Sequence, residues 1–266
     1  MRLSWHALLV LAGLPLMSSP ALAFDCAKAA SAVEKAICGD RGLRRADEAM
    51  GAAYTKLLRS APDAGIREML VASQRRWLQA RDQWFDVREP GKDGLAGAIK
   101  DRTATLADAS DKGLVARAQA QRAFLSKYSG GAFAGFNATC DFLPNDRELT
   151  SWSYGCAEFT AHAQNGNRVC SIQQTWATFA AYSQRAVSEI VDGKPKAVAY
   201  CDFSDREDSS CGDSAAQTRW NRNPAEIGDY PWPATGLPKL DAEVDLTDEG
   251  GWLAECLSAA AYPPPG

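Results

Sequence analysis

All eight cysteines of this 266-residue chain lie behind an N-terminal segment that has the features of a secretory signal. Arg2 gives this segment a positive charge, the run from Leu8 to Leu16 is apolar, and Ala21 to Ala23 supply the small residues that precede cleavage. The apolar run is too short for a membrane-spanning helix. We therefore expect residues 1–23 to be a signal peptide and residues 24–266 to reach the periplasm or the exterior without a membrane anchor. In such an oxidising compartment cysteines pair as disulfides.

The charges of the chain are divided unequally. Residues 24–128 carry 19 Lys and Arg against 14 Asp and Glu, whereas residues 129–266 carry 9 against 19. A net charge of −10 on the second half argues against nucleic acid as its partner and favours a basic protein. The opposite signs also allow a simpler interpretation, in which the two halves attract each other.

The composition leaves little room for the usual catalytic chemistry. His162 is the only histidine of residues 24–266. A catalytic triad, a Cys–His pair or a two-histidine metal site would have to use it or do without it. Its place in an alternating stretch before Asn165 and Gly166 predicts a surface residue of a strand. Because the cysteines also show no Cys-x-x-Cys spacing, we expect a protein that is not an enzyme and holds no metal and no cofactor.

Residues 24–128 have the periodicity of an antiparallel bundle of amphipathic helices. Ser31 and Glu34 form a capping box before a short helix, which Gly39 is expected to end as the C-cap. Longer helices should follow, with prolines at their ends and apolar residues at helical spacing. Their expected apolar stripes are Leu43 to Leu58, Ile66 to Val87 with Trp77 and Trp84 in the core, and Leu95 to Leu106 with a continuation to Leu125.

The pattern changes at Ser129 to Gly131, where we place the boundary between a helical domain, residues 24–128, and an acidic cysteine-rich domain, residues 129–266. Alternation in the second domain predicts strands, with hairpin turns at Asn165-Gly166 and Asp192-Gly193. The expected fold class is α+β, a helical bundle followed by a disulfide-rich, mainly β domain. Six cysteines of this domain pair in any of about fifteen ways, among which the sequence does not choose: Cys140, Cys156, Cys170, Cys201, Cys211 and Cys256.

Cys26 and Cys38 bracket the capped helix of the first domain. A disulfide between them would fasten the extended N-terminus to that helix. In the chain-entropy model a loop of this size is worth roughly 3 kcal/mol. We expect these two cysteines to be bonded to each other, which separates them from the six cysteines of the second domain.

The residues around this pair resemble the N-terminal domain of the LprI-like lysozyme inhibitor family. The strings Phe24 to Ala29 and Val33 to Cys38 carry the first part of the resemblance, which extends over about residues 24–106. The resemblance implies a helical domain and a role in inhibiting lysozyme. The other positions that fit the family are Leu43, Asp47, Tyr54, Gln74, Arg75, Trp77, Leu78, Arg81, Asp82, Leu95, Arg102 and Leu106.

One departure from the family concerns a second cysteine pair, which its members commonly have. The corresponding places hold Trp84 and Gly94 in this chain. Both partners are absent together, so no thiol is left single. We expect Trp84 to fill the space by apolar packing and the bundle to fold without that bridge.

Two parts of the second domain are candidate binding surfaces. Trp232 stands between Pro231 and Pro233, which would hold its indole outward to stack on a sugar; the simpler interpretation is a ring that covers a small core. The other candidate is the acidic loop between two cysteines, which would attract a basic lysozyme. A solvated turn is its simpler interpretation, and a calcium loop would need a glycine and glutamate that are absent. The acidic residues are Asp202, Asp205, Glu207 and Asp208.

The sequence thus predicts a secreted periplasmic binding protein, with the inhibition of a lysozyme-type cell-wall hydrolase as its first function. The expected partner is a basic protein such as a lysozyme or another cell-wall hydrolase. Two alternatives stay open. One is a glycan- or peptidoglycan-binding protein of the cell envelope, and the other is an immunity protein against a secreted cell-wall-degrading toxin.

Overall fold

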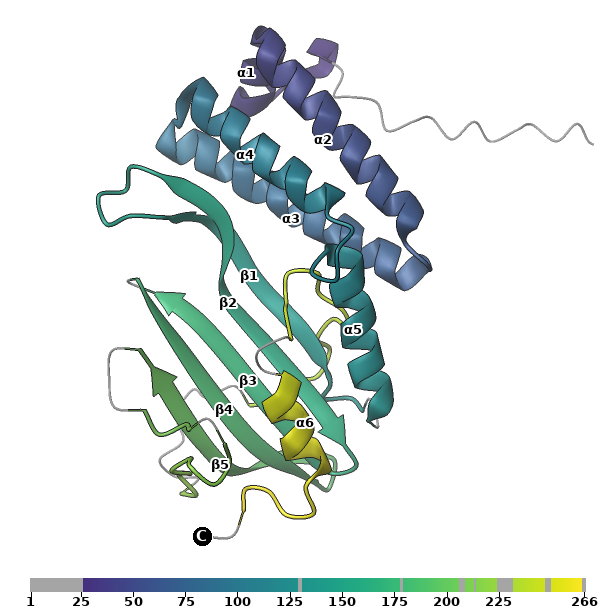
Figure 1. Cartoon of the computed structure of the whole chain (residues 1–266), viewed down its shortest axis with the longest axis vertical. Coiled ribbons are helices and arrows are strands. Elements are labelled where there is room, and N and C mark those ends of the chain that lie inside the picture. The colour runs from purple at the N-terminus through teal and green to yellow at the C-terminus, as the bar shows by residue number, and fades with distance from the viewer. Residues whose placement is uncertain are drawn as a thin grey trace, which may run out of the picture.

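The structure, a computed structural model, describes residues 26–128, 131–177, 179–205, 209–212, 214–223, 232–246 and 250–264. In these residues five α-helices precede a five-stranded antiparallel sheet, and a sixth lies on the sheet (Figure 1). The protein is therefore α+β, as the sequence predicts. The elements are η1 (Cys26–Lys28), α1 (Ala32–Gly39), α2 (Arg41–Ser60), α3 (Ala64–Arg88), α4 (Gly91–Ala107), α5 (Leu114–Lys127), β1 (Gly135–Pro144), β2 (Trp152–Asn165), β3 (Arg168–Ala177), β4 (Ala180–Val191), β5 (Lys194–Ser204) and α6 (Gly250–Ser258).

The expected signal peptide, residues 1–23, lies outside the described residues. Within the described part of the chain, no helix has the length and the apolar character that a membrane span needs.

Capping interactions explain where the first two helices begin. The Ser31 hydroxyl accepts a hydrogen bond from the Glu34 amide, and the Glu34 carboxylate accepts one from the Ser31 amide at 2.9 Å. The Asp40 carboxylate accepts bonds from two amides in the first turn of α2, which makes Asp40 its N-cap. The expectation that Gly39 is the C-cap of α1 is wrong. Asp40 takes that position, because the residue that starts α2 must itself have an extended backbone.

The eight cysteines form four disulfides. The predicted bond between Cys26 and Cys38 is confirmed, with its Cα atoms 5.6 Å apart. The six cysteines of the second half bond among themselves, so no disulfide links helices α1–α5 to the sheet. The pairs that the sequence left open are Cys140–Cys156, Cys170–Cys256 and Cys201–Cys211.

The core of the helical part is built around α3. Trp77 and Trp84 are buried in it, as their helical spacing predicts. A Cβ atom added to Gly94 would lie 3.5 Å from the Trp84 ring and 2.8 Å from the Cβ of Pro90. The indole of Trp84 therefore packs beside the place where the second cysteine pair of the family is missing, as expected.

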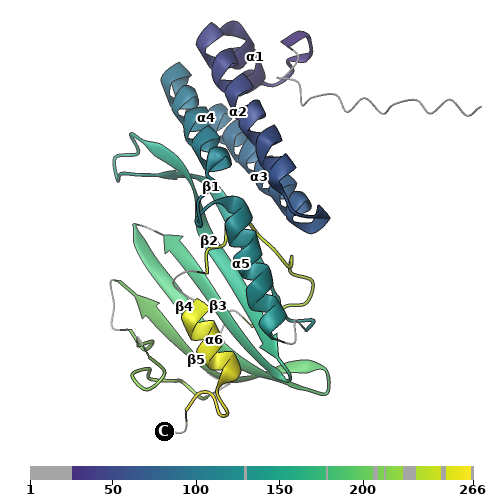
Figure 2. The same cartoon turned by 45° about the vertical axis from the view of Figure 1, so that its right-hand side comes forward.

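The last helical run is interrupted. α4 ends at Ala107 and α5 begins at Leu114, so the second is a separate helix and not a continuation of the first. A Cβ atom on Gly113, the N-cap of α5, would lie 2.3 Å from the carbonyl oxygen of Asp108, and this close approach of the backbone requires glycine. α5 leaves the bundle and lies along the β1 side of the sheet (Figures 1 and 2).

The five strands pair in chain order as an antiparallel meander. Both predicted hairpins are confirmed. Asp192 and Gly193 have positive φ angles of 52° and 75°, which a type I′ turn requires. The turn of the other hairpin lies one residue later than expected. Asn165 pairs with Arg168 as the last pair of the ladder, so Gly166, with φ 56°, and Asn167 form the turn.

α6 covers one face of the sheet, which we call the front face (Figure 2). Alternate residues of each strand share a face, and the front face supplies a second core that α6 completes. The disulfide between Cys170 of β3 and Cys256 fastens α6 to the sheet. The buried front-face residues under α6 include Ala161, Ala163, Cys170, Ile172 and Val187.

Residues 238–246, which we call the strap, run from the sheet to the helices. Asp241 accepts two hydrogen bonds from the guanidinium of Arg76 in α3, at 2.8 and 3.1 Å, and one from the Ala138 amide in β1 at 3.1 Å. The Gln121 side chain of α5 donates to the Asp241 carbonyl oxygen at 2.7 Å. The strap therefore joins α3, α5 and β1 through one buried aspartate.

A second polar contact of the strap lies between α3 and α4. The Arg102 side chain, only 1% exposed, has its Nη1 3.6 Å from the carboxylate of Glu243. Its Nε donates to the Gln74 side chain at 2.9 Å, and its Nη2 donates to the Ser73 hydroxyl at the same distance. Ser73 in turn donates to Glu243 at 2.6 Å. Burial lowers the pKa of Arg102, but guanidinium stays charged at any ordinary pH.

The helices and the sheet also share apolar contacts. The Phe142 ring of β1 stacks on Trp84 with centroids 4.3 Å apart, and it belongs to the core of the helical part. Separate folding of residues 24–128 and 129–266 stays a prediction, with limited proteolysis near Ser129 to Gly131 as its test.

His162 is not the surface residue that the alternation predicts. It is 2% exposed and lies on the face of the sheet opposite the front face, which we call the back face. Its Nδ1 has no hydrogen-bond partner in the described structure. Gly135 pairs with His162 across β1 and β2, and a Cβ on Gly135 would lie 2.6 Å from the Pro238 carbonyl oxygen and 2.7 Å from the Cβ of Leu237. The prediction is wrong because the chain around Leu237 covers a face that alternation alone assigns to solvent.

Burial of His162 should make stability depend on pH. Burial lowers its pKa to about 4, from about 6.5 in the unfolded chain. The unfolded chain therefore takes up the proton first, and the free energy of unfolding should fall by about 3 kcal/mol between pH 6.5 and pH 4. Urea unfolding at steps between pH 7 and pH 4 measures this loss. His162→Gln should lack this part of the pH dependence, and identical profiles of the two proteins would contradict the prediction.

Candidate functional site

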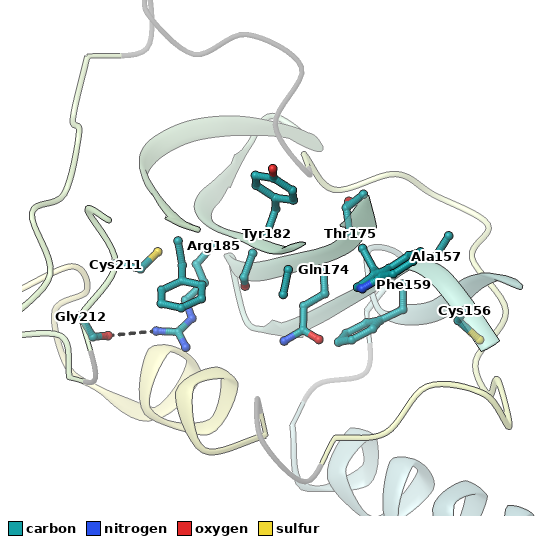
Figure 3. Close-up of a pocket in the computed structure, with 13 residues that line it drawn as sticks. Cys156, Ala157, Phe159, Gln174, Thr175, Tyr182, Arg185, Cys211 and Gly212 are labelled. Atoms are coloured by element: carbon teal, nitrogen blue, oxygen red, sulfur yellow. Dashed lines mark hydrogen bonds between the residues drawn. The ribbon is translucent and has the colours of Figure 1, made fainter. Parts of the chain in front are cut away.

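A cavity of about 340 Å³ opens on the front face of the sheet, next to the area that α6 covers (Figure 3). Its floor is a row of residues that lie directly opposite one another on four strands. Phe159 of β2 pairs with Gln174 of β3, Gln174 with Ser183 of β4, and Ser183 with Phe203 of β5. Trp176 lies two residues beyond Gln174, on the same face.

The polar groups of the cavity come from β3 and β4. The Ser183 side chain is 8% exposed, and its Oγ makes no hydrogen bond within the described residues. Arg185 follows two residues later, and its Nη1 donates to the Gly212 carbonyl oxygen at 3.3 Å. The guanidinium also lies 5.5 Å from the centre of the Trp252 ring in α6. Arg185 is thus held between α6 and the loop that follows Cys211.

Two disulfides stiffen the rim of the cavity. Cys156 lies at one end and Cys211 at the other (Figure 3). Cys156 is bonded to Cys140 of the neighbouring strand, and Cys211 to Cys201 of β5. Each end of the cavity is therefore cross-linked by a disulfide.

The acidic loop predicted from the sequence borders this cavity. Asp205 is exposed, and its carboxylate accepts a hydrogen bond from the amide of Ala181, a residue that lines the cavity, at 3.2 Å. Asp202 lies one residue before Phe203 in β5, so its side chain points to the back face. The structure separates these two acidic residues. Glu207 and Asp208 lie outside the described residues.

The other predicted contact, Trp232, belongs to a different segment. Trp232 is half-buried in residues 232–246, and Pro233 beside it is buried. Trp252 is buried as well and packs against Tyr262 with ring centroids 6.4 Å apart.

The positions that carry the family resemblance are mostly interior. Gln74 and Arg102 belong to the buried network under the strap. Arg81 is buried beside the Trp77 ring and donates two hydrogen bonds to Asp82, at 2.7 and 2.8 Å. Gln74, Arg81 and Arg102 are thus interior, whereas the Asp82 side chain is 41% exposed.

Metal ligation finds no support in the part of the chain that the structure describes. No group of three or more His, Cys, Asp or Glu side chains is placed there to hold an ion.

Together these features define an α+β protein in which a helical region with a buried polar network adjoins a disulfide-braced sheet that carries a cavity. Residues 26–126 match the family model of the lysozyme inhibitor LprI. The resemblance seen in the sequence is thereby confirmed for the N-terminal region, and the sheet lies outside the match. A comparison with curated proteins gave no match, and a comparison with solved structures gave none either.

The front-face cavity was missed at the level of the sequence. Its residues are spread from Phe159 to Phe203 and meet only through the register of four strands. The two hairpin turns would have given the signal, because a turn of known length sets the register of its strands.

Proposed function

We propose that this protein is a periplasmic inhibitor of a lysozyme-type cell-wall hydrolase. The match of residues 26–126 to an inhibitor family carries the proposal. Four disulfides support an oxidising compartment such as the periplasm. Inhibition needs a complementary surface and no chemistry of its own, which suits a chain whose one described histidine is buried and held neutral.

The acidic half supports a basic partner. Residues 129–266 carry a net charge of −10, and such a charge accelerates association with a basic protein through long-range attraction. An immunity protein against a basic cell-wall-degrading toxin would use the same attraction.

A turnover assay tests the proposal directly. Residues 24–266, purified with their disulfides intact, should slow peptidoglycan clearing by at least one lysozyme class in a stoichiometric manner. The same protein after reduction and alkylation is the control and should not inhibit. Unchanged turnover across several lysozyme classes, with the protein in molar excess, would leave the proposal without support.

The contribution of the acidic loop has its own readout. If the loop contacts the enzyme, the association rate should fall as ionic strength rises past about 0.1 M, where the screening length is about 10 Å. The variant Asp205→Asn, Glu207→Gln, Asp208→Asn should associate more slowly than the wild type. A matched variant that changes the exposed residues Asp86, Glu89 and Asp93 in the same way should not. Equal slowing by both variants would assign the effect to net charge alone.

A further inference from the structure

The hairpin of β1 and β2 continues past the rest of the sheet. β2 pairs with β3 only from Glu158 onward, and residues 140–156, which we call the arm, have no ladder partner outside themselves in the described structure. The disulfide between Cys140 and Cys156 closes the arm where it leaves the sheet. In Figures 1 and 2 the arm projects beyond the upper ends of β3 and β4. The arm is therefore a protrusion with a covalently closed base.

Helix α3 supports one side of the arm. The Phe142 ring stacks on Trp84 with centroids 4.3 Å apart. The guanidinium of Arg88 lies 4.5 Å from the centre of the Trp152 ring, which belongs to the last ladder pair before the loop. The two strands of the arm are thus held against α3 as far as their ends. What projects beyond this support is the loop of residues 145–151.

This loop is longer than most hairpin connections, which have about 2–5 residues. Asp146 organises it, because its carboxylate accepts four hydrogen bonds at 2.7 to 3.0 Å from the amides and hydroxyls of Ser151 and Thr150. The Asn145 amide also donates to the Ser151 carbonyl oxygen at 2.9 Å. The bonds from Ser151 and Thr150 lower the pKa of Asp146 to about 2, so this carboxylate stays charged at neutral pH. The loop therefore has one defined conformation.

Leu149 is the large apolar side chain that the loop exposes. It is 50% exposed, and its backbone has the left-handed φ angle of 59°. Leucine rarely adopts this conformation, which asparagine and glycine adopt readily. The Trp152 indole donates to the Leu149 carbonyl oxygen at 3.2 Å and helps to fix it. An apolar side chain on an ordered protrusion loses little conformational entropy when a partner covers it, which favours a role in binding.

We propose that the arm enters the substrate cleft of the inhibited cell-wall hydrolase, with Leu149 as its apolar contact, an inference that rests on the proposed function. A narrow protrusion complements a cleft better than it complements a flat surface. The cleft of a glycoside hydrolase holds two carboxyl groups, which would repel most of the acidic half. The exposed charges of the loop, Arg147 and Glu148, balance each other.

The position of the acidic loop agrees with this placement. Asp205 follows the end of β5, and the antiparallel order of the strands puts that end of β5 at the same end of the sheet as the arm. The acidic loop can therefore face the basic surface around a cleft while the arm enters the cleft itself. One partner would then contact both elements.

Two variants of residues 24–266 and a matched control test the arm in the lysozyme turnover assay. Leu149→Asn removes the apolar side chain but suits the φ angle, so it should weaken inhibition about tenfold while the urea midpoint stays equal or rises. Asp146→Ala keeps Leu149 but removes four hydrogen bonds, and it should weaken inhibition at least threefold. Val191→Asn changes an apolar residue that is 47% exposed at the opposite end of the sheet, and it should inhibit like the wild type.

Competition with a sugar tests the cleft. Binding of the wild type to a lysozyme saturated with tri-N-acetylchitotriose, a short glycan that occupies the cleft, should be at least tenfold weaker than binding to the free enzyme. Wild-type inhibition by Leu149→Asn, or equal binding with and without the trisaccharide, would overturn this inference and leave the proposed function standing. Failure of the wild type to inhibit any lysozyme class would overturn the proposed function and this inference with it.

Discussion

Replacement of Arg102 by methionine is expected to lower the free energy of unfolding by about 3–5 kcal/mol. The substitution keeps most of the side-chain volume but leaves the Glu243 carboxylate, itself only 9% exposed, without its cation. It also removes the hydrogen bonds that Arg102 donates to Gln74 and to Ser73. Urea unfolding followed by circular dichroism measures the loss as a lower midpoint.

A second substitution and a surface pair make this prediction specific. Adding Glu243→Gln to Arg102→Met removes the unpaired charge and should restore part of the stability. Arg122→Met removes the ion pair between Arg122 of α5 and Asp63. The side chains of Arg122 and Asp63 are 44% and 39% exposed. The substitution should cost less than about 1 kcal/mol, because exposed ion pairs contribute little. Similar losses for Arg102→Met and Arg122→Met would show that burial of the first pair does not matter.

Removal of the disulfide between Cys170 and Cys256 should have a comparable effect. The bond closes a loop over a sequence separation of 86, and in the chain-entropy model this constraint is worth roughly 4–5 kcal/mol. The double variant Cys170→Ala, Cys256→Ala should therefore unfold at a much lower urea concentration. Because the bond also fastens α6 to β3, the Trp252 fluorescence should change along with the midpoint.

The bond between Cys201 and Cys211 provides the control for loop length. It spans a separation of 10, for which the same model gives roughly 2–3 kcal/mol. Cys201→Ala, Cys211→Ala should thus cost clearly less than loss of the longer loop. Equal losses would contradict the entropic origin of the difference and point to local packing.

Local signals in the sequence were sufficient for most of the helical part. The capping box of Ser31 and Glu34 and the helical spacing of Trp77 and Trp84 depend on neighbours within a few residues, and the structure confirms them. The glycines at 166 and 193 mark both hairpins for the same reason. α6 was not predicted, although Trp252, Leu253, Cys256 and Leu257 have the spacing of one helix face.

The predictions that failed concern contacts between segments that are far apart in the sequence. The burial of His162 comes from the chain near Leu237, about 75 residues away in sequence, and no alternation pattern reports such a cover. The partner of Cys170 follows from the position of α6 on the front face. Of the predicted site, Asp202 lies within β5 and points to the opposite face from Phe203, whereas Asp205 follows the end of β5 and lies at the cavity edge, where it accepts a hydrogen bond from the Ala181 amide. Contact of these residues with a hydrolase stays a proposal.

The strap has a consequence for how the chain is made. Synthesis delivers the N-terminus first, and α2, α3 and α4 are complete more than 130 residues before Asp241, Ala242 and Glu243 appear. Until then Arg76 and Arg102 have no carboxylate from the strap, and the apolar contact of Ala242 with the helical core is missing. A chain that stops before residue 238 would keep every helix of the bundle and still expose these groups. Proteases that remove incomplete chains would therefore act on the N-terminal helices, which are synthesised first. These helices are far in sequence from the point of truncation.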